Sequence, residues 1–268
     1  MTRSFRAELQ KLCRRRIYVA AAIGALAFAL IATVAVVLSA EPARGGGGAP
    51  PGRGAPTLES LGATGGLAES FSTGVSFLGI LVLVLFVANF GGEFSQGTFR
   101  TLLMRQPHRI GLLAGKMAAL LLFAGVLLAL AELLSVATSL ALALAPGQQI
   151  STSSWLTLDG AGEAASAYAS ALLGVTAWAT LGATLAVLLR SVPLALGIGV
   201  AWSGPIEHLV SDVWTGAAQW FPGLLLESWA VGGTDDVSAA HAALVLSLYV
   251  GAAGALAALT FRRRDFAG

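Results

Sequence analysis

Few residues in this sequence could carry chemistry, because only 11% of its 268 residues are charged and 56% are hydrophobic. Ser203 and His241 could act as the nucleophile and base of an intramembrane serine protease, since both are expected at the outer membrane depth. Rhomboid-like enzymes carry Gly-x-Ser-Gly, whereas this chain reads Val200-Ala-Trp-Ser203-Gly204. A Ser-Gly pair with a distant histidine arises readily by chance, so the protease is a minor alternative.

No nucleotide, cofactor or metal site is expected in this chain. Its one Gly-Lys candidate, Gly111-Leu-Leu-Ala-Gly115-Lys116-Met117, lacks the spacer and the Ser or Thr with which a P-loop holds phosphate and magnesium. The single cysteine, Cys13, can form neither a disulfide within the chain nor a cysteine metal site. We therefore expect no catalytic residues here.

A polar stretch between two apolar blocks is the best functional clue. It begins at Asn89, continues through Arg109 and ends at Gly115-Lys116. A loop that only joins two membrane helices could be a few residues long, so this length suggests a docking element. Thr98 can cap a short helix there, and Pro107 can help to end it. Phe99, Leu102 and Leu103 give this helix an apolar side. Its arginines, Arg100, Arg105 and Arg109, then remain for a protein partner, unless the stretch is only a solvated basic loop.

The apolar blocks around this stretch predict an all-α polytopic membrane protein. About 20 apolar residues in a helix cross the ~30 Å hydrocarbon core of a bilayer. Six blocks meet or approach that length, so we predict six transmembrane helices, at Ile17–Ala40, Phe71–Phe90, Met117–Ala145, Ala164–Leu189, Ser191–Ile206 and Val237–Phe261.

The connections between these spans differ in character. Residues 1–16 place apolar side chains at helical spacing among arginines, which predicts an amphipathic helix at the inner membrane surface. Residues 41–66 are rich in Gly and Pro and predict a flexible outer loop. The fifth span is short, and residues 207–236 after it are rich in Trp, so we predict a re-entrant outer segment there. Residues 91–116 form the inner loop that contains the polar stretch.

The distribution of charge predicts the orientation. With both termini in the cytoplasm, every one of the 16 Lys and Arg residues except Arg44 and Arg53 lies inside. This topology explains the basic pI, so nucleic-acid binding is not expected. Glu132 is the one acidic residue well inside a predicted span; it could line a pathway or hold a partner helix, or lie near the outer interface.

The polar stretch resembles the inner loop of type-2 permeases of ATP-binding cassette transporters. That loop reads Glu-x-x-x-Gly-Thr followed by Leu, Pro, Arg and Lys, and this chain has, in that order, Glu93, Gly97-Thr98, Leu102-Leu103, Pro107, Arg109 and Lys116. The chain end, Arg262-Arg263-Arg264-Asp265, is also similar to the family's tail. The resemblance implies a coupling helix that docks into a cytoplasmic ATPase. It assigns coupling to Glu93, Gly97, Thr98, Phe99, Arg100, Pro107 and Arg109, with Lys116 marking re-entry into the membrane.

The resemblance also implies a function. The chain would be the permease subunit of an exporter in the bacterial cytoplasmic membrane, working with two cytoplasmic ATPase subunits that bind ATP and Mg and with a second permease protomer, identical or different. A secondary transporter is the other alternative, although such proteins normally carry more ionisable groups at midplane than Glu132 alone.

Overall fold

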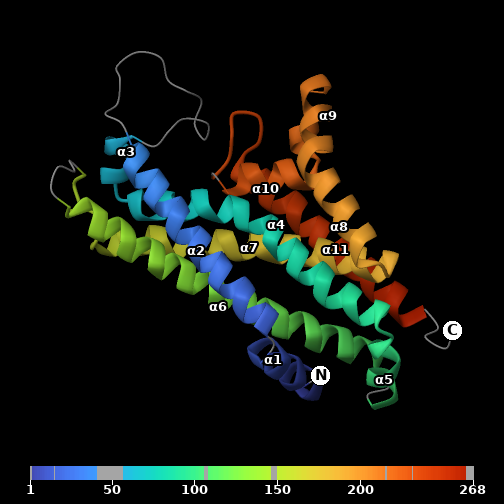
Figure 1. Ribbon diagram of the computed structural model, residues 1–268. Helices are drawn as coiled ribbons and strands as arrows, with labels where there is room; N and C mark the ends of the chain where they lie inside the picture. Colours follow the sequence, from blue (N-terminus) through green and yellow to red (C-terminus); the bar gives the residue numbers. More distant parts are fainter. Residues whose placement is uncertain are drawn as a thin grey trace.

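The computed structural model describes residues 2–14, 16–40, 57–105, 108–145, 150–214, 216–230 and 232–263. Their regular structure is helical (Figure 1). The elements are α1 (Thr2–Arg14), α2 (Arg16–Ser39), α3 (Leu58–Gly62), α4 (Gly66–Ser95), α5 (Thr98–Arg105), α6 (Arg109–Ala143), α7 (Leu158–Leu189), α8 (Val192–Ala201), the π-helical turn η1 (Trp202–Ile206), α9 (Glu207–Val213), the 3-10 turn η2 (Ala217–Gln219), α10 (Pro222–Ala230) and α11 (Ala239–Arg263).

Five of these helices, α2, α4, α6, α7 and α11, are long and apolar enough to cross a membrane within the described part of the chain. The prediction of an all-α polytopic membrane protein is therefore confirmed at this level. The predicted fifth span, Ser191–Ile206, is not among them, because its residues are divided between α8 and η1. Pro205 lies inside η1, where a residue without a backbone N–H favours such a break.

The inner loop is much shorter than hydropathy indicated. We predicted residues 91–116 as a loop, but α4 continues to Ser95 and α6 already begins at Arg109. Polar residues at the ends of these helices lower the hydropathy without breaking the helical backbone. The real connection therefore consists of little more than α5, and it joins two long rigid helices.

Small residues allow α4 and α7 to approach closely at the centre of the molecule. A Cβ atom on Gly182 of α7 would lie 2.9 Å from the carbonyl oxygen of Leu83 on α4. A Cβ atom on Gly79 would lie 2.2 Å from Nε1 of Trp178, so the indole fills the space that this glycine leaves. Glycines at helix contacts are common in membrane proteins because they permit such close packing.

The N-terminal helix α1 is attached to the bundle. Leu12 is fully buried and belongs to the same hydrophobic cluster as Leu112 and Leu120 of α6. Cys13 is exposed on the other side of α1. The predicted amphipathic helix therefore forms, and its apolar side packs against protein.

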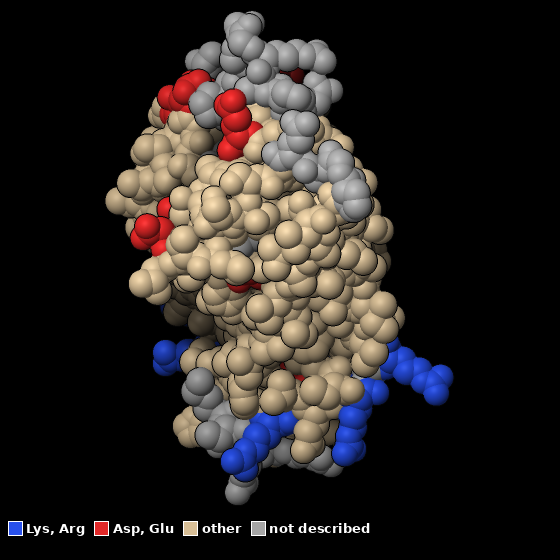
Figure 2. Space-filling model, turned by 90° about the vertical axis from the view of Figure 1, so that its left-hand side faces the viewer, with Lys and Arg blue, Asp and Glu red and all other residues tan. Residues whose placement is uncertain are grey.

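The surface of the molecule separates charge from apolar side chains. On the face seen in Figure 2, Lys and Arg gather at one end of the molecule, and most of the visible Asp and Glu lie toward the other. Between the ends, large apolar side chains are exposed on the outer helices, for example Ile31 on α2, Leu133 on α6 and Leu248 on α11. An exposed apolar belt between two charged ends is the surface expected of a protein surrounded by lipid. We call the Lys- and Arg-rich end the basic end.

Candidate coupling site at the basic end

A glycine turn separates α4 from α5. Gly97 has a φ of +64°, a conformation that glycine adopts without strain, and its N–H donates to the Phe94 carbonyl at 3.2 Å. The Thr98 hydroxyl donates to the Glu93 carbonyl at 3.1 Å. We predicted that Thr98 accepts a bond from the first turn of α5; the structure instead shows it closing the end of α4.

Helix α5 has a buried side and an exposed side. Phe99 is only 1% exposed, and its ring centroid lies 4.4 Å from that of Phe94 and 5.3 Å from that of Phe261 on α11. Leu102 and Leu103 pack against the same cluster. On the opposite side Arg100 and Thr101 are exposed, and Met104 is 73% exposed. Helix α5 is therefore anchored to the bundle through its aromatic side and presents its other side outward.

The start of α6 is tied to the end of α11. The Arg109 guanidinium donates to the carbonyl of Arg262 at 2.9 Å. In Figure 1, α5 lies at the same end of the molecule as α1 and the end of α11. Pro107, predicted to end the short helix, lies outside the described residues, as does the side chain of Arg105.

Four charged side chains from three helices, α1, α4 and α6, meet at the basic end. Lys116 of α6 lies 3.0 Å from Glu8 Oε1 and 2.8 Å from Glu93 Oε1. Lys11 of α1 contacts the same two oxygen atoms, at 3.1 Å and 2.5 Å. Asn89 Nδ2 donates to Glu8 Oε1 at 3.0 Å and to the Tyr18 hydroxyl at 2.7 Å. We call these six residues the basic-end cluster.

The basic-end cluster balances its own charge away from water. The Lys116 side chain is 3% exposed, and the Glu8 and Glu93 side chains are each 10% exposed. Burial favours the neutral acid, but Lys116 and Lys11 outweigh it and lower the pKa of Glu8. Burial likewise opposes the charge of Lys11, and the two carboxylates, Glu93 foremost, raise its pKa. The ion pairs among these four side chains hold α1 against α4 and α6.

The basic-end cluster is incompletely satisfied. Glu93 Oε2 and Asn89 Oδ1 are buried and have no hydrogen-bond partner among the described residues. A buried acceptor without a hydrogen bond raises the free energy of the folded state, so these two atoms mark a place where the packing of α4 is not at its optimum.

The structure separates the predicted coupling residues into two groups. Arg100 is exposed on α5 and can reach a partner. Glu93, Lys116 and Phe99 are buried, so they cannot contact a partner directly and instead hold α5 and its neighbouring helices in place. The sequence analysis did not identify Glu8 and Lys11 on α1 or Asn89 on α4 as members of this cluster. The spacing of Glu8 and Lys11 on one amphipathic helix was a signal that could have indicated them.

The other candidate residues lie elsewhere. Glu132 is half-buried on α6, 16 residues or about 24 Å beyond Lys116, which places it toward the opposite end of the span. The Ser203 hydroxyl donates to the Gly199 carbonyl at 2.7 Å. His241 Nε2 lies 3.0 Å from the Gln219 carbonyl oxygen. Among the described residues these last two side chains have separate partners and form no catalytic pair.

Together, five apolar spans and an anchored helix at the basic end define an all-helical, multi-pass membrane protein. The chain belongs to the family described as "Protein of unknown function (DUF2705)", which matches residues 53–267 and so covers α3 to α11. No curated protein matches the chain. The family expected from the polar stretch, the type-2 permeases of ATP-binding cassette transporters, is therefore wrong as an assignment. One short motif with hydropathy and charge does not distinguish families of membrane proteins that share those features.

Proposed function

We propose that this protein is the membrane-spanning subunit of an exporter powered by separate cytoplasmic ATPase subunits of the ATP-binding cassette type. The two-sided packing of α5 carries the proposal. Its inner side is buried against α4 and α11 through Phe99, while Arg100 and Met104 point outward. A partner that pushes on the outer side would displace these spans with α5, which is the mechanical requirement for coupling.

The basic-end cluster strengthens this argument, because it ties α4, the helix that precedes α5, to α1 and α6. A push that displaces α5 and α4 would therefore also reach two further helices, α1 and α6, through these ion pairs. Hydrolysis of ATP, with its Mg ion, takes place in the partner, and this chain contributes movement and no catalytic group.

We place the basic end in the cytoplasm of a bacterium, with both termini inside, because Lys and Arg concentrate there (Figure 2). In this arrangement α8 and η1 form a sixth span, and residues 207–236, with η2 and α10, form a re-entrant outer segment. Two ATPase subunits and a second permease protomer, identical or different, complete the transporter.

The test is to purify the tagged chain from its native membrane in mild detergent, identify the proteins that accompany it, and measure ATPase activity. We expect a stoichiometric ATPase in the wild type. We expect it to be lost in Arg100→Glu combined with Met104→Glu, because this change places two carboxylates on the outer side of α5, where the ATPase is proposed to bind. Both side chains are exposed, so the change disturbs no packing.

Arg14→Glu, an exposed basic residue on α1, is the matched control and should keep the ATPase. Phe99→Ala is unsuitable as the main variant, because it removes a buried ring and lowers stability by about 3–5 kcal/mol. Recovery of the chain alone in every case would contradict the proposal, and a secondary carrier would then be the better interpretation.

A further inference from the structure

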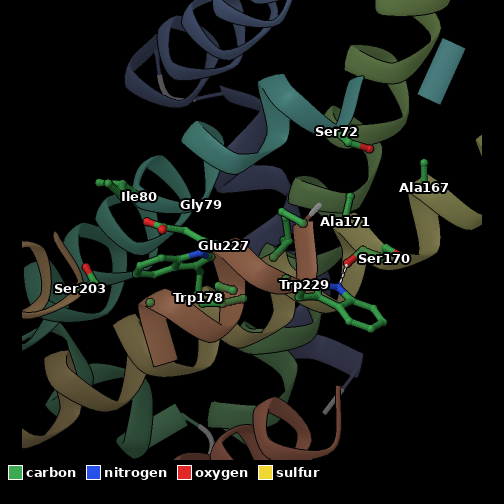
Figure 3. Close-up of a pocket in the computed structure, with 15 residues that line it drawn as sticks. Ser72, Gly79, Ile80, Ala167, Ser170, Ala171, Trp178, Ser203, Glu227 and Trp229 are labelled. Atoms are coloured by element: carbon green, nitrogen blue, oxygen red, sulfur yellow. Dashed lines mark hydrogen bonds between the residues drawn. The ribbon is translucent and has the colours of Figure 1, made fainter. Parts of the chain in front are cut away.

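A pocket lies between α4, α7, η1 and α10 (Figure 3). Its walls are mostly small or apolar, including Gly79, Ala171, Gly174 and Leu226. Two indole rings, those of Trp178 and Trp229, belong to its lining (Figure 3). The Trp229 N–H is already bound to the Ser170 carbonyl at 2.7 Å, which holds that ring in place.

Trp178 is 8% exposed, and its N–H makes no hydrogen bond to any described residue. Glu227 also lines the pocket, and its side chain is 55% exposed. In Figure 3 the Glu227 side chain lies on the same side of the pocket as the Trp178 ring. A carboxylate beside an indole in an apolar hollow is the combination that attracts an organic cation, through charge and through the negative face of the ring.

We propose that this pocket binds an amphiphilic organic cation, with one apolar group of the ligand in the hollow beside the lining indole rings and its positive charge at Glu227. Describing this ligand as an exported substrate rests on the proposed function. Binding itself does not, because no residue of the pocket belongs to α5 or to the basic-end cluster.

His208 competes with the ligand for Glu227. Its Nε2 lies 3.3 Å from Glu227 Oε2, and its Nδ1 lies 2.8 Å from the Gly204 carbonyl oxygen. With Nδ1–H given to the carbonyl, only a protonated ring can also donate to the carboxylate. The Gly204 carbonyl foremost, and the Glu227 and Glu207 carboxylates, raise the pKa of His208. At low pH the charge of Glu227 is therefore balanced internally.

The experiment measures saturable binding of tetraphenylphosphonium to the full chain in lipid nanodiscs by equilibrium dialysis, after subtraction of empty nanodiscs. Tetraphenylborate, which has the same shape and the opposite charge, is the matched probe. We expect saturable binding of the cation only. Saturable binding of both ions with equal affinity, or of neither, would overturn the proposal.

Two pairs of variants test the place of binding. Glu227→Gln should weaken binding about tenfold, the loss that corresponds to about 1.4 kcal/mol, whereas Glu163→Gln, an exposed acid on α7, should not. Gly174→Leu should fill the pocket, since its Cβ meets only ordinary contact with Leu226 at 3.7 Å, whereas Gly162→Leu, which faces open space, should leave binding unchanged. Equal affinity in all four variants would show that the cation binds elsewhere.

The dependence on pH supplies an independent readout. Wild-type affinity should rise as His208 loses its proton. Glu207 titrates nearby and contacts Gly223 in the pocket lining, so His208→Gln combined with Glu207→Gln is the variant that should bind the cation equally well across that range. A wild-type affinity independent of pH would contradict the role of Glu227. Because co-purification of an ATPase does not involve this pocket, failure here and failure of the proposed function can be told apart.

Discussion

At the scale of single residues, each charge of the basic-end cluster is stable only because the others are present. Lys116 is 3% exposed and faces two carboxylates, so its removal would leave two buried negative charges against Lys11 alone. Breaking a buried ion pair from one side generally costs more than the pair contributes, because the remaining charge has lost its water.

We therefore expect Lys116→Met to lower the free energy of unfolding by about 3–5 kcal/mol. Arg100→Met changes the same charge at an exposed position and is the control. Denaturation in detergent with a tryptophan fluorescence readout measures both. Similar stability of the two variants would show that the basic-end cluster contributes nothing.

A second prediction at this scale concerns Glu207 and the dependence of stability on pH. Its side chain is fully buried, and its Oε2 accepts from the backbone N–H of Leu224 at 3.0 Å. Burial raises the pKa of Glu207 from 4.5 to about 6, although the N–H groups of Leu224 and Gly223 act in the opposite direction. A raised pKa means that the folded state holds the proton more tightly than the unfolded state does.

The contribution of Glu207 to stability is thus complete below pH 4.5 and is lost as the pH rises through about 6. The loss amounts to at most about 2 kcal/mol. Glu207→Gln keeps the acceptor for Leu224 and should remove this part of the pH dependence. Thermal unfolding midpoints between pH 4 and 7 test it, and identical profiles for the variant and the wild type would refute the assignment.

At the scale of elements, the angle between α4 and α5 depends on Gly97. Its φ of +64° costs an L-residue about 1–2 kcal/mol, so Gly97→Ala should destabilise the turn or tilt α5. Gly92, one turn earlier on α4, has an ordinary helical backbone and room for a Cβ, with only the Gln96 side chain 3.9 Å away. Gly92→Ala is therefore the control.

We expect Gly97→Ala to reduce the ATPase activity that accompanies the chain by more than its modest loss of stability explains, and Gly92→Ala to leave that activity unchanged. The activity of the purified complex, normalised to the amount of bound ATPase, is the measurement. Equal activity in both variants would mean that the direction of α5 is unimportant.

At the scale of the whole molecule, the separation of charge predicts how the chain lies in its membrane. Cys13 is the single cysteine and is exposed on α1 at the basic end. A membrane-impermeant maleimide should therefore label it in inverted vesicles and leave it unlabelled in intact cells. In a Cys13→Ser background, Leu158→Cys, at a position 93% exposed at the start of α7, should show the opposite pattern. Labelling of Cys13 in intact cells would mean that the orientation is the reverse of the one proposed.

Much of the fold could be predicted from hydropathy, because a helix long enough to cross a bilayer must be continuously apolar. Helices α2 and α11 lie within two residues of the predicted apolar blocks, and α7 ends where predicted but begins six residues earlier. The predicted fifth span differed because a block of 16 apolar residues contains Pro205, and the backbone there forms a π-helical turn. Both ends of α4 and the start of α6 were misplaced, because hydropathy records side chains and not the backbone conformation.

The sequence by itself determined the class of this protein, the short helix after Gly97 and its division into apolar and basic sides. These depend on local composition and period, which a chain carries whatever it packs against. Only the tertiary structure decided that Phe99 faces inward, and that Glu8 meets Asn89 and Lys116 across separations of 81 and 108 residues. Such contacts depend on how helices approach one another in space, and no local pattern records that approach.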